Sequence, residues 1–150
     1  MKFRDVKGSA IESPREYNWR PAVYGVLIED GKILIMQPNW DDKYCLPGGA
    51  IELGENLVES LEREFFEETG YSIRVNSDPI YIDSHLFGKP ESDLFFQRIS
   101  IYYQIERVSE EQSGKIDKET VGLYWKKLSD LSVDDFTFFQ QDFLRTILGK

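Results

Sequence analysis

The sequence has few of the residues that cross-link a chain or anchor it in a membrane. Its single cysteine, Cys45, excludes a disulfide within the chain and is typical of a protein in a reducing compartment. No apolar run approaches the roughly 20 residues that a membrane-spanning helix needs. The first residues, MKFRDVKGS, lack the apolar core of a signal peptide. We therefore expect a cytoplasmic protein that does not associate with membranes.

Basic residues are also scarce. The chain has 18 Lys and Arg residues against 27 Asp and Glu residues, which gives a formal net charge of −9. Because no basic patch dominates, this balance argues against a protein that binds nucleic acid polymers. An acidic protein that binds phosphate groups would need cations between its own carboxylates and the phosphates.

The rest of the composition is that of an ordinary folded domain. Hydrophobic residues make up 41% of the 150 residues and charged residues make up 30%. A chain of this length can bury a sizeable core. It contains no internal repeat and no low-complexity segment, so we expect a single domain over residues 1–150.

The order of apolar patterns predicts an α+β fold. Residues 29–31 predict a hairpin turn between two strands, and periodicity near residue 57 and near the C-terminus predicts two helices. The predicted strands cover residues 22–28, 32–37, 72–75, 80–87, 94–108 and 121–127. The C-terminal helix is predicted over residues 132–148. A mixed β-sheet held between the two helices accounts for this order.

The helix that begins near residue 57 has recognisable signals at both ends. Asn56 and Glu59 are spaced as a capping box, and Gly70 can adopt a positive φ just after the last turn. Apolar residues recur inside the helix at a spacing that forms one stripe, namely Leu57, Val58, Leu61 and Phe65. The stripe predicts that this helix packs against the sheet.

Three carboxylates lie along one edge of that stripe. Glu64 and Glu68 are one helical turn apart, and Glu67 lies beside them. Like charges at this spacing repel, and a position next to a buried surface raises the cost unless a cation is bound. Mg²⁺ suits such a site because it accepts carboxylates and completes its shell with water and substrate phosphate. A solvated acidic helix face is the alternative, but Glu55 and Arg63 in register favour the cation site.

The spacing of these residues resembles the Nudix box. That pattern reads Gly, five residues, Glu, seven residues, Arg-Glu, a bulky apolar residue, any residue, Glu-Glu, any residue, Gly and a final bulky apolar residue. The matching positions are Gly49, Glu55, Arg63, Glu64, Phe65, Glu67, Glu68, Gly70 and Tyr71. Only Phe65 and Tyr71 depart, since aliphatic residues are commoner there. The motif covers 23 of the 150 residues, and the remainder resembles the MutT-like members in its order of elements.

The resemblance implies an α/β/α sandwich and a reaction. Nudix enzymes typically hydrolyse a pyrophosphate bond in a nucleoside diphosphate derivative by water attack on phosphorus, with Mg²⁺ or Mn²⁺ as cofactor. The substrate stays open among a nucleoside triphosphate (oxidised or not), a nucleotide sugar and a dinucleotide. A non-catalytic Nudix module that senses a nucleotide is the alternative, although such modules tend to lose box glutamates and this chain has lost none. A homodimer also stays open, because dimers are frequent in the family.

The resemblance also assigns roles to the residues of the box. Glu64 and Glu68 would be the main metal ligands, and Glu67 would be a third ligand or a base that orients the water. Glu55 would bind a second ion when substrate is present. The glycine pair is expected to form a turn, in which the backbone carbonyl of Gly48 approaches the metal.

Two further charged residues are assigned beside these ligands. Arg63 would hold the ligands in place by pairing with Glu55 or Glu67. Glu119 is the best-placed general base outside the box, with a solvated loop residue as the alternative. His85, the only histidine, is expected to be structural, and Cys45 is expected to be a small apolar side chain.

Substrate-binding residues are less clearly marked. Trp40, in a polar loop, is expected to be exposed and able to stack on a base, and Gln140 falls near the amide with which MutT reads a guanine edge. The stretch over residues 35–38 lacks the basic residue that MutT-like members often carry there. Four other basic residues could reach phosphates but are expected to be surface charges, namely Arg20, Lys43, Lys89 and Arg98.

Overall fold

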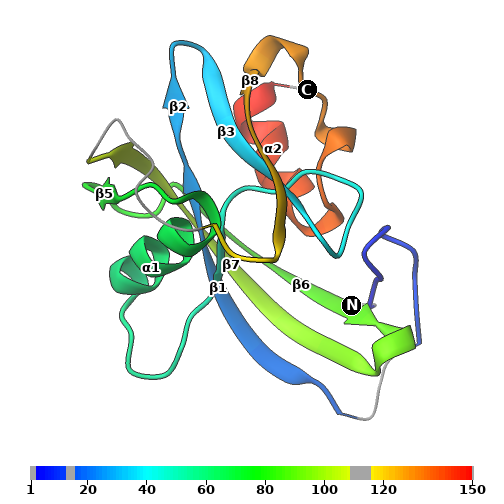
Figure 1. The fold of residues 1–150 in the computed structure, drawn as a ribbon. Helices are drawn as coiled ribbons and strands as arrows, with labels where there is room; N and C mark the ends of the chain where they lie inside the picture. The colour runs from blue at the N-terminus through cyan, green and yellow to red at the C-terminus, as the bar shows by residue number, and fades with distance from the viewer. Residues whose placement is uncertain (1–2, 13–15, 109–115, 150) are drawn as a thin grey trace.

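A computed structural model describes residues 3–12, 16–108 and 116–149 and contains two sheets (Figure 1). The larger one has five strands, and its parallel β1–β7 pair among antiparallel neighbours makes it a mixed sheet. Its members are β4 (Gly48–Ala50), β1 (Asn18–Val26), β7 (Leu94–Arg107), β5 (Ile73–Val75) and β6 (Tyr81–Lys89). The smaller sheet contains β2 (Ile28–Glu29), β3 (Lys32–Pro38) and β8 (Thr120–Lys127).

Helices cover the two faces of the strands, as Figure 1 shows, and the alternation of side chains explains why. Tyr24 of β1 lies in a core with Phe143 of α2 (Gln141–Leu148). The next residue, Val23, points the other way, into a core with Phe65 of α1 (Leu57–Thr69). Successive side chains of a strand face opposite sides of the sheet, so one buried strand serves both cores. The predicted α+β sandwich is confirmed.

Helix α1 has the predicted ends. The side chain of Asn56 accepts a hydrogen bond from the amide of Glu59 at 2.9 Å, and the side chain of Glu59 accepts from the amide of Asn56 at 3.2 Å. Gly70 has a φ of 75°, and its amide donates to the carbonyl of Phe66 at 2.8 Å. The capping box thus marks the start of the helix and Gly70 marks its end. The carboxylates between them are spaced along the helix as predicted.

The predicted C-terminal helix over residues 132–148 is too long. Only Gln141–Leu148 are α-helical, and two short 3₁₀ turns, Val133–Asp135 and Phe138–Gln140, come before them. The reason is that the chain around Tyr44 pairs with this segment. The amide of Tyr44 donates to the carbonyl of Asp135 at 2.9 Å, and the carbonyl of Tyr44 accepts from the amide of Thr137 at 2.8 Å. These bonds hold the segment extended where a helix would continue.

The glycine pair forms strand β4 and not the predicted turn. Gly48 and Gly49 pair with Tyr24 and Val23 of β1 in antiparallel register. Gly48 has a φ of 147°, and a Cβ atom there would collide with the carbonyl oxygen of Val23. At Gly49 a Cβ atom would lie 2.6 Å from the carboxyl carbon of Glu64. The glycines therefore let β4 run close to both β1 and α1.

The other predicted strands are observed with shifts of one to four residues. β1 begins at Asn18, ahead of the predicted start at residue 22, because it stays paired with β7 along its whole length. The predicted hairpin joins β2 to β3, with Asp30 and Gly31 at φ values of 50° and 74°. Among the described residues, neither helix is long and apolar enough to cross a membrane.

Candidate active site

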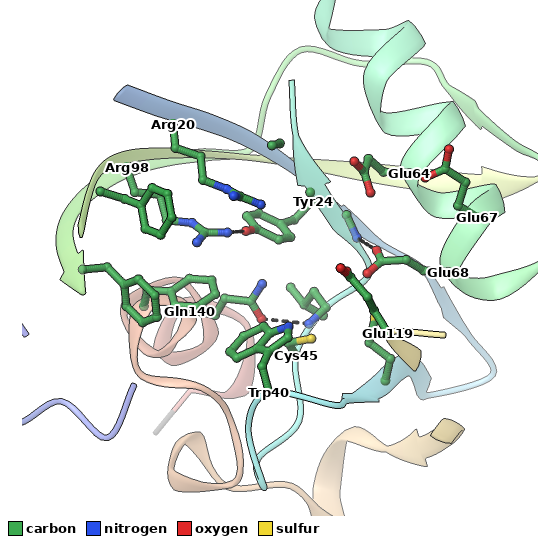
Figure 2. Close-up of a pocket in the computed structure, with 18 of the residues that line it drawn as sticks. Arg20, Tyr24, Trp40, Cys45, Glu64, Glu67, Glu68, Arg98, Glu119 and Gln140 are labelled. Atoms are coloured by element: carbon green, nitrogen blue, oxygen red, sulfur yellow. Dashed lines mark hydrogen bonds between the residues drawn. The ribbon is translucent and has the colours of Figure 1, made fainter. Parts of the chain in front are cut away.

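A pocket of about 510 Å³ opens between α1, β1 and the segment before α2. Its two ends differ in charge, as Figure 2 shows. One end is acidic and is lined by Glu52, Glu64, Glu67, Glu68, Asp117 and Glu119. The other end is aromatic and basic and is lined by Arg20, Tyr24, Trp40, Phe87, Lys89, Phe96, Arg98, Phe139 and Gln140. We call these the acidic end and the basic end.

Glu68 lies deepest at the acidic end. Its side chain is buried, with 6% of the residue exposed, and its Oε1 accepts a hydrogen bond from the amide of Gly48 at 2.6 Å. Burial raises the pKa of Glu68 well above its usual value, although the Gly48 bond works in the opposite direction. Burial also raises the pKa of Glu64. Two carboxylates that water solvates poorly are stabilised by a cation between them.

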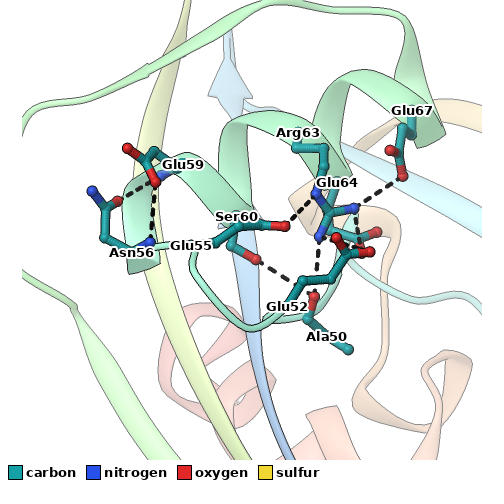
Figure 3. Close-up of polar contacts among 9 residues, drawn as sticks. All are labelled: Ala50, Glu52, Glu55, Asn56, Glu59, Ser60, Arg63, Glu64 and Glu67. Atoms are coloured by element: carbon teal, nitrogen blue, oxygen red, sulfur yellow. Dashed lines mark hydrogen bonds and ion pairs between the residues drawn. The ribbon is translucent and has the colours of Figure 1, made fainter.

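Arg63 gathers the remaining carboxylates of the box, as Figure 3 shows. Its Nε donates to Glu55 at 2.8 Å, and its Nη1 donates to Glu64 at 3.0 Å and to Glu67 at 3.2 Å. Its Nη2 donates to the carbonyl of Ala50 at 3.3 Å. The resemblance implies Glu55 or Glu67 as the partner of Arg63, and in the structure Arg63 bonds to both of them.

In this network the opposite charges favour the charged forms of one another. Burial works against the charge of Arg63, but the carboxylates of Glu55 and Glu64 outweigh it and raise the pKa of the guanidinium. The hydrogen bond from Arg63 lowers the pKa of Glu55 in turn. Both groups therefore stay charged, and the ion pair fixes the orientation of the side chains at this end of the pocket.

A loop before β8 closes the acidic end from the opposite side. The amide of Asp117 donates to the carbonyl of Glu67 at 2.9 Å, and the hydroxyl of Thr120 donates to the carbonyl of Glu68 at 3.1 Å. Between these anchors, the exposed side chain of Glu119 lines the pocket. Its charge contributes to the raised pKa values of Glu64 and Glu68. The predicted general base is therefore brought to the box glutamates.

Asp117 is a pocket residue that sequence reasoning missed. It lies between the predicted strands over residues 94–108 and 121–127, close to the start of the second. The one local signal is its carboxylate, which accepts from the amides of Glu119 and Thr120 at 3.1 and 3.2 Å, a turn motif typical of aspartate. That signal predicts a turn but not a place beside α1, which depends on the fold.

The donor groups fit a divalent cation. Carboxylate oxygens are hard ligands that suit Mg²⁺ and Mn²⁺, and members of the Nudix family generally use divalent cations. In the part of the chain that the structure describes, no three such side chains are already grouped as a metal site. The reason is visible in the contacts: Arg63 holds Glu64 and Glu67, and the Gly48 amide holds Glu68.

The basic end contains residues whose surroundings differ from the prediction. Arg98, expected on the surface, is only 8% exposed; it donates to the hydroxyl of Tyr24 and lies 4.0 Å from the centre of the Phe139 ring. Trp40, expected to be exposed, is half-buried and stacks on Phe139 with ring centres 6.0 Å apart. It is half-buried because its loop folds onto the core that contains Phe139.

Gln140 is fully buried at the basic end. Its Oε1 accepts from the amide of Leu46 at 2.8 Å, so its side-chain nitrogen is the end left for a ligand. Cys45 is buried at the floor of the pocket, where burial raises the pKa of the thiol, in keeping with an apolar role. His85 does not line the pocket; its Nε2 lies 3.5 Å from Asp83.

Comparison with known proteins agrees with this geometry. The NUDIX domain model matches residues 18–147. The chain is 32% identical over 117 residues to the ADP-ribose pyrophosphatase of Methanocaldococcus jannaschii, covering 75% of this chain and 66% of that protein. It is 30% identical over 96 residues to the nucleoside triphosphatase NudI of Escherichia coli, covering 59% of this chain and 64% of that protein.

Among solved structures, the MutT protein of Methanosarcina mazei Go1 has the same fold. The two superpose with a TM-score of 0.67 at 22% identity, over 89% of this chain and 95% of that one. The curated relatives are longer than the matched region, since the chain spans 38%, 66% and 31% of three of them. Five residues of the box line the pocket, namely Gly49, Arg63, Glu64, Glu67 and Glu68, whereas Glu55 does not line it and contacts Arg63 instead. Because the family model covers most of the chain, the protein belongs to the Nudix family.

Proposed function

We propose that this protein hydrolyses a pyrophosphate bond in a nucleoside diphosphate derivative. The observation that carries the proposal is the two-ended pocket, in which the box glutamates face a half-buried aromatic and basic end. Its volume of about 510 Å³ is within the range of small-molecule sites. The names of two relatives, an ADP-ribose pyrophosphatase and a nucleoside triphosphatase, support a substrate of this class.

The acidic end would hold the reacting phosphate through Mg²⁺ or Mn²⁺. When bound, such a cation neutralises phosphate oxygens and lowers the pKa of a coordinated water. Glu64 and Glu68 are the proposed main ligands, with Glu67 as a third ligand or water-orienting base and Glu55 for a second ion. The backbone carbonyl of Gly48 is the proposed fifth donor.

Other residues would position and activate these groups. Arg63 orients Glu64 and Glu67 through hydrogen bonds that exist before any ligand binds. Such pre-organised charges lower the reorganisation needed during the reaction. Glu119, on the opposite wall, is the proposed general base that accepts a proton from the attacking water. Its position on an exposed loop leaves it room to reach a water molecule.

The basic end would hold the rest of the nucleotide. Trp40 presents a ring backed by Phe139 on which a base can stack, and the side-chain nitrogen of Gln140 can donate to an acceptor on the ligand. The acidic composition and the single cysteine support a small-molecule nucleotide substrate in the cytoplasm, in preference to a nucleic acid polymer. A homodimer is compatible with this proposal.

Hydrolysis across a substrate panel tests the proposal. Phosphate and pyrophosphate release would be measured for triphosphates, oxidised dGTP, ADP-ribose, nucleotide sugars and dinucleotides, with Mg²⁺, Mn²⁺ or a chelator. Glu68→Gln should fold normally and lose turnover by a factor of about 100 or more, because it removes a ligand charge. Glu62→Gln, an exposed change on the same helix, is the control.

Two results would contradict the proposal. Turnover that persists in chelator would exclude the cation mechanism, and near-normal activity of Glu68→Gln would exclude Glu68 as a ligand. Tight nucleotide binding without turnover of any substrate would instead support the non-catalytic sensor.

A further inference from the structure

Two arginines lie side by side at the basic end of the pocket. Arg20 of β1 and Arg98 of β7 are paired Cα partners in the parallel register, so their side chains leave the sheet on the same face. Both line the pocket. Figure 2 shows the two side chains reaching toward Tyr24, across the pocket from the glutamates of α1.

Neither arginine is paired with a carboxylate among the described residues. Arg98 donates to the neutral hydroxyl of Tyr24, and Arg20 lies 5.2 Å from the centre of the Phe96 ring. Burial lowers the pKa of Arg20, and the neighbouring charge of Arg98 lowers it further. Two adjacent cations, one buried and one half-buried, thus lie in the pocket with no carboxylate in ion-pair contact, and Glu64 and Glu119 act on Arg20 only from a distance. A negatively charged ligand would relieve this arrangement.

Three buried polar atoms at this end have no hydrogen-bond partner in the part of the chain that the structure describes, and all three are donors. They are the Nε atoms of Arg20 and Arg98 and the side-chain nitrogen of Gln140, and each is buried. A flip of the Gln140 side-chain amide would place its oxygen toward the ligand, but it would lose the hydrogen bond from the Leu46 amide. Buried donors are usually satisfied, so a ligand rich in acceptor oxygens is expected here. Nearby, Lys89 lies 5.2 Å from the centre of the Trp40 ring and adds a third positive charge.

We propose that Arg20, Arg98 and Gln140 form an oxyanion subsite for a phosphate or carboxylate group of the substrate. This group is distinct from the phosphate held at the box glutamates. The subsite also accounts for the missing basic residue over residues 35–38, since the arginines of β1 and β7 provide positive charge to the same pocket. The proposal rests on the proposed function only in taking a nucleotide derivative as the ligand.

The oxyanion can come from two parts of such a ligand. It is either the second phosphoryl group of the diphosphate itself or an additional acidic group, such as an extra phosphate or the carboxylate of an acidic sugar. Matched substrates that differ only in this extra group separate the two sources.

The first experiment measures binding without catalysis. Inorganic phosphate is titrated by calorimetry in chelator, so that no cation can link it to the glutamates. Arg20→Gln and Arg98→Gln should each weaken binding by about tenfold or more, as expected for a lost charge-assisted bond. Arg74→Gln, the same change at a 60% exposed side chain on β5, should leave it unchanged. No phosphate binding by the wild-type protein, or equal weakening in Arg74→Gln, overturns the subsite.

Arg98 is buried, so its replacement can disturb folding. Arg98→Lys keeps the charge and is the second variant; it should recover most of the phosphate affinity lost in Arg98→Gln. Thermal unfolding of each variant is recorded alongside. If Arg20→Gln, at a half-exposed position, folds normally and binds phosphate as the wild type does, the subsite is wrong whatever Arg98→Gln does.

The second experiment separates binding from turnover. In the hydrolysis assay, Arg20→Gln should raise KM by about tenfold. The value of kcat should change by less than about threefold if the oxyanion is an extra group away from the reacting phosphate, and should fall as well if the oxyanion is the phosphoryl group that leaves. An equal rise for neutral and acidic substrate pairs assigns the diphosphate as the source, and a rise only for acidic substrates assigns the extra group. An unchanged KM overturns the subsite while hydrolysis stands. Phosphate binding without hydrolysis of any substrate leaves the subsite and refutes the proposed function.

Discussion

The two ends of the pocket treat charge in opposite ways. At the acidic end, Arg63 bonds to Glu55, Glu64 and Glu67, and the Gly48 amide bonds to Glu68. At the basic end, the guanidinium groups face rings and a hydroxyl, and the donors that remain have no acceptor among the described residues.

The difference indicates how each end is organised. At the acidic end the carboxylates are bonded within the chain before a cation arrives, although no three of them among the described residues are grouped as a metal site. The basic end is completed only when a ligand supplies acceptors. Changes at the acidic end should therefore act mainly on turnover, and changes at the basic end should act on ligand affinity.

Among replacements of Arg63, Gln140 and Glu29, that of Arg63 should have the largest effect, because it breaks the orientation of the acidic end. We expect Arg63→Gln to lower turnover and affinity for the cation by about 10- to 100-fold, the usual cost of losing a residue that orients metal ligands. Initial rates across a Mn²⁺ titration measure both quantities. Arg145→Gln, an exposed arginine paired with Asp142, is the control. An unchanged Mn²⁺ dependence would mean that Arg63 does not orient the ligands.

Replacing Gln140 should produce a smaller effect at the basic end. Gln140→Leu leaves the buried amide of Leu46 without an acceptor, which should cost about 1–3 kcal/mol of unfolding free energy. Gln140→Glu keeps the acceptor and places a carboxylate beside the arginines, so it should retain stability while weakening phosphate binding. Urea unfolding measures the free energies, with the exposed Gln104→Leu as control. Equal stability of Gln140→Leu and wild type would contradict the role of this bond.

An ion pair outside the pocket should have the smallest effect. Arg107 donates to Glu29 at 2.6 Å, and this bond lowers the pKa of Glu29. Because the pKa is lower in the folded state, the stabilisation is present above the unfolded value of about 4.5 and disappears as the pH falls below it.

We expect Glu29→Gln to reduce the unfolding free energy by less than about 1 kcal/mol at pH 7, since the pair is partly exposed to solvent. The difference from wild type should shrink as the pH falls below about 4.5 and through the lowered pKa of Glu29. Urea unfolding at several pH values measures it, and a difference that grows as the pH falls would show that the sign is wrong.

Local signals in the sequence were sufficient to predict helix α1 and both of its ends. Asn56, Glu59 and Gly70 mark its ends through contacts within a few residues, and the carboxylate spacing follows from helix geometry. The resemblance to the Nudix box implied Glu55 or Glu67 as the partner of Arg63; both bonds are observed, and the further bond to Glu64 was not predicted.

Features that depend on distant contacts could not be predicted in the same way. The C-terminal helix starts late because residues near Tyr44 pair with the segment before it. Arg98 is an ordinary polar position in the strand pattern, and only the packing of Phe139 over it shows that it is buried. Asp117 reaches the pocket through a bond to the backbone of Glu67, some 50 positions earlier in the chain.

The bond between the Gly48 amide and Glu68 has a consequence for spectroscopy. A short bond of 2.6 Å from a backbone N–H to a carboxylate shifts the amide proton resonance strongly downfield. When Glu68 turns to share its charge with a cation, that shift must change, whether or not any substrate is present. The amide resonance of Gly48 in a ¹⁵N-labelled sample therefore reports whether a cation occupies the acidic end.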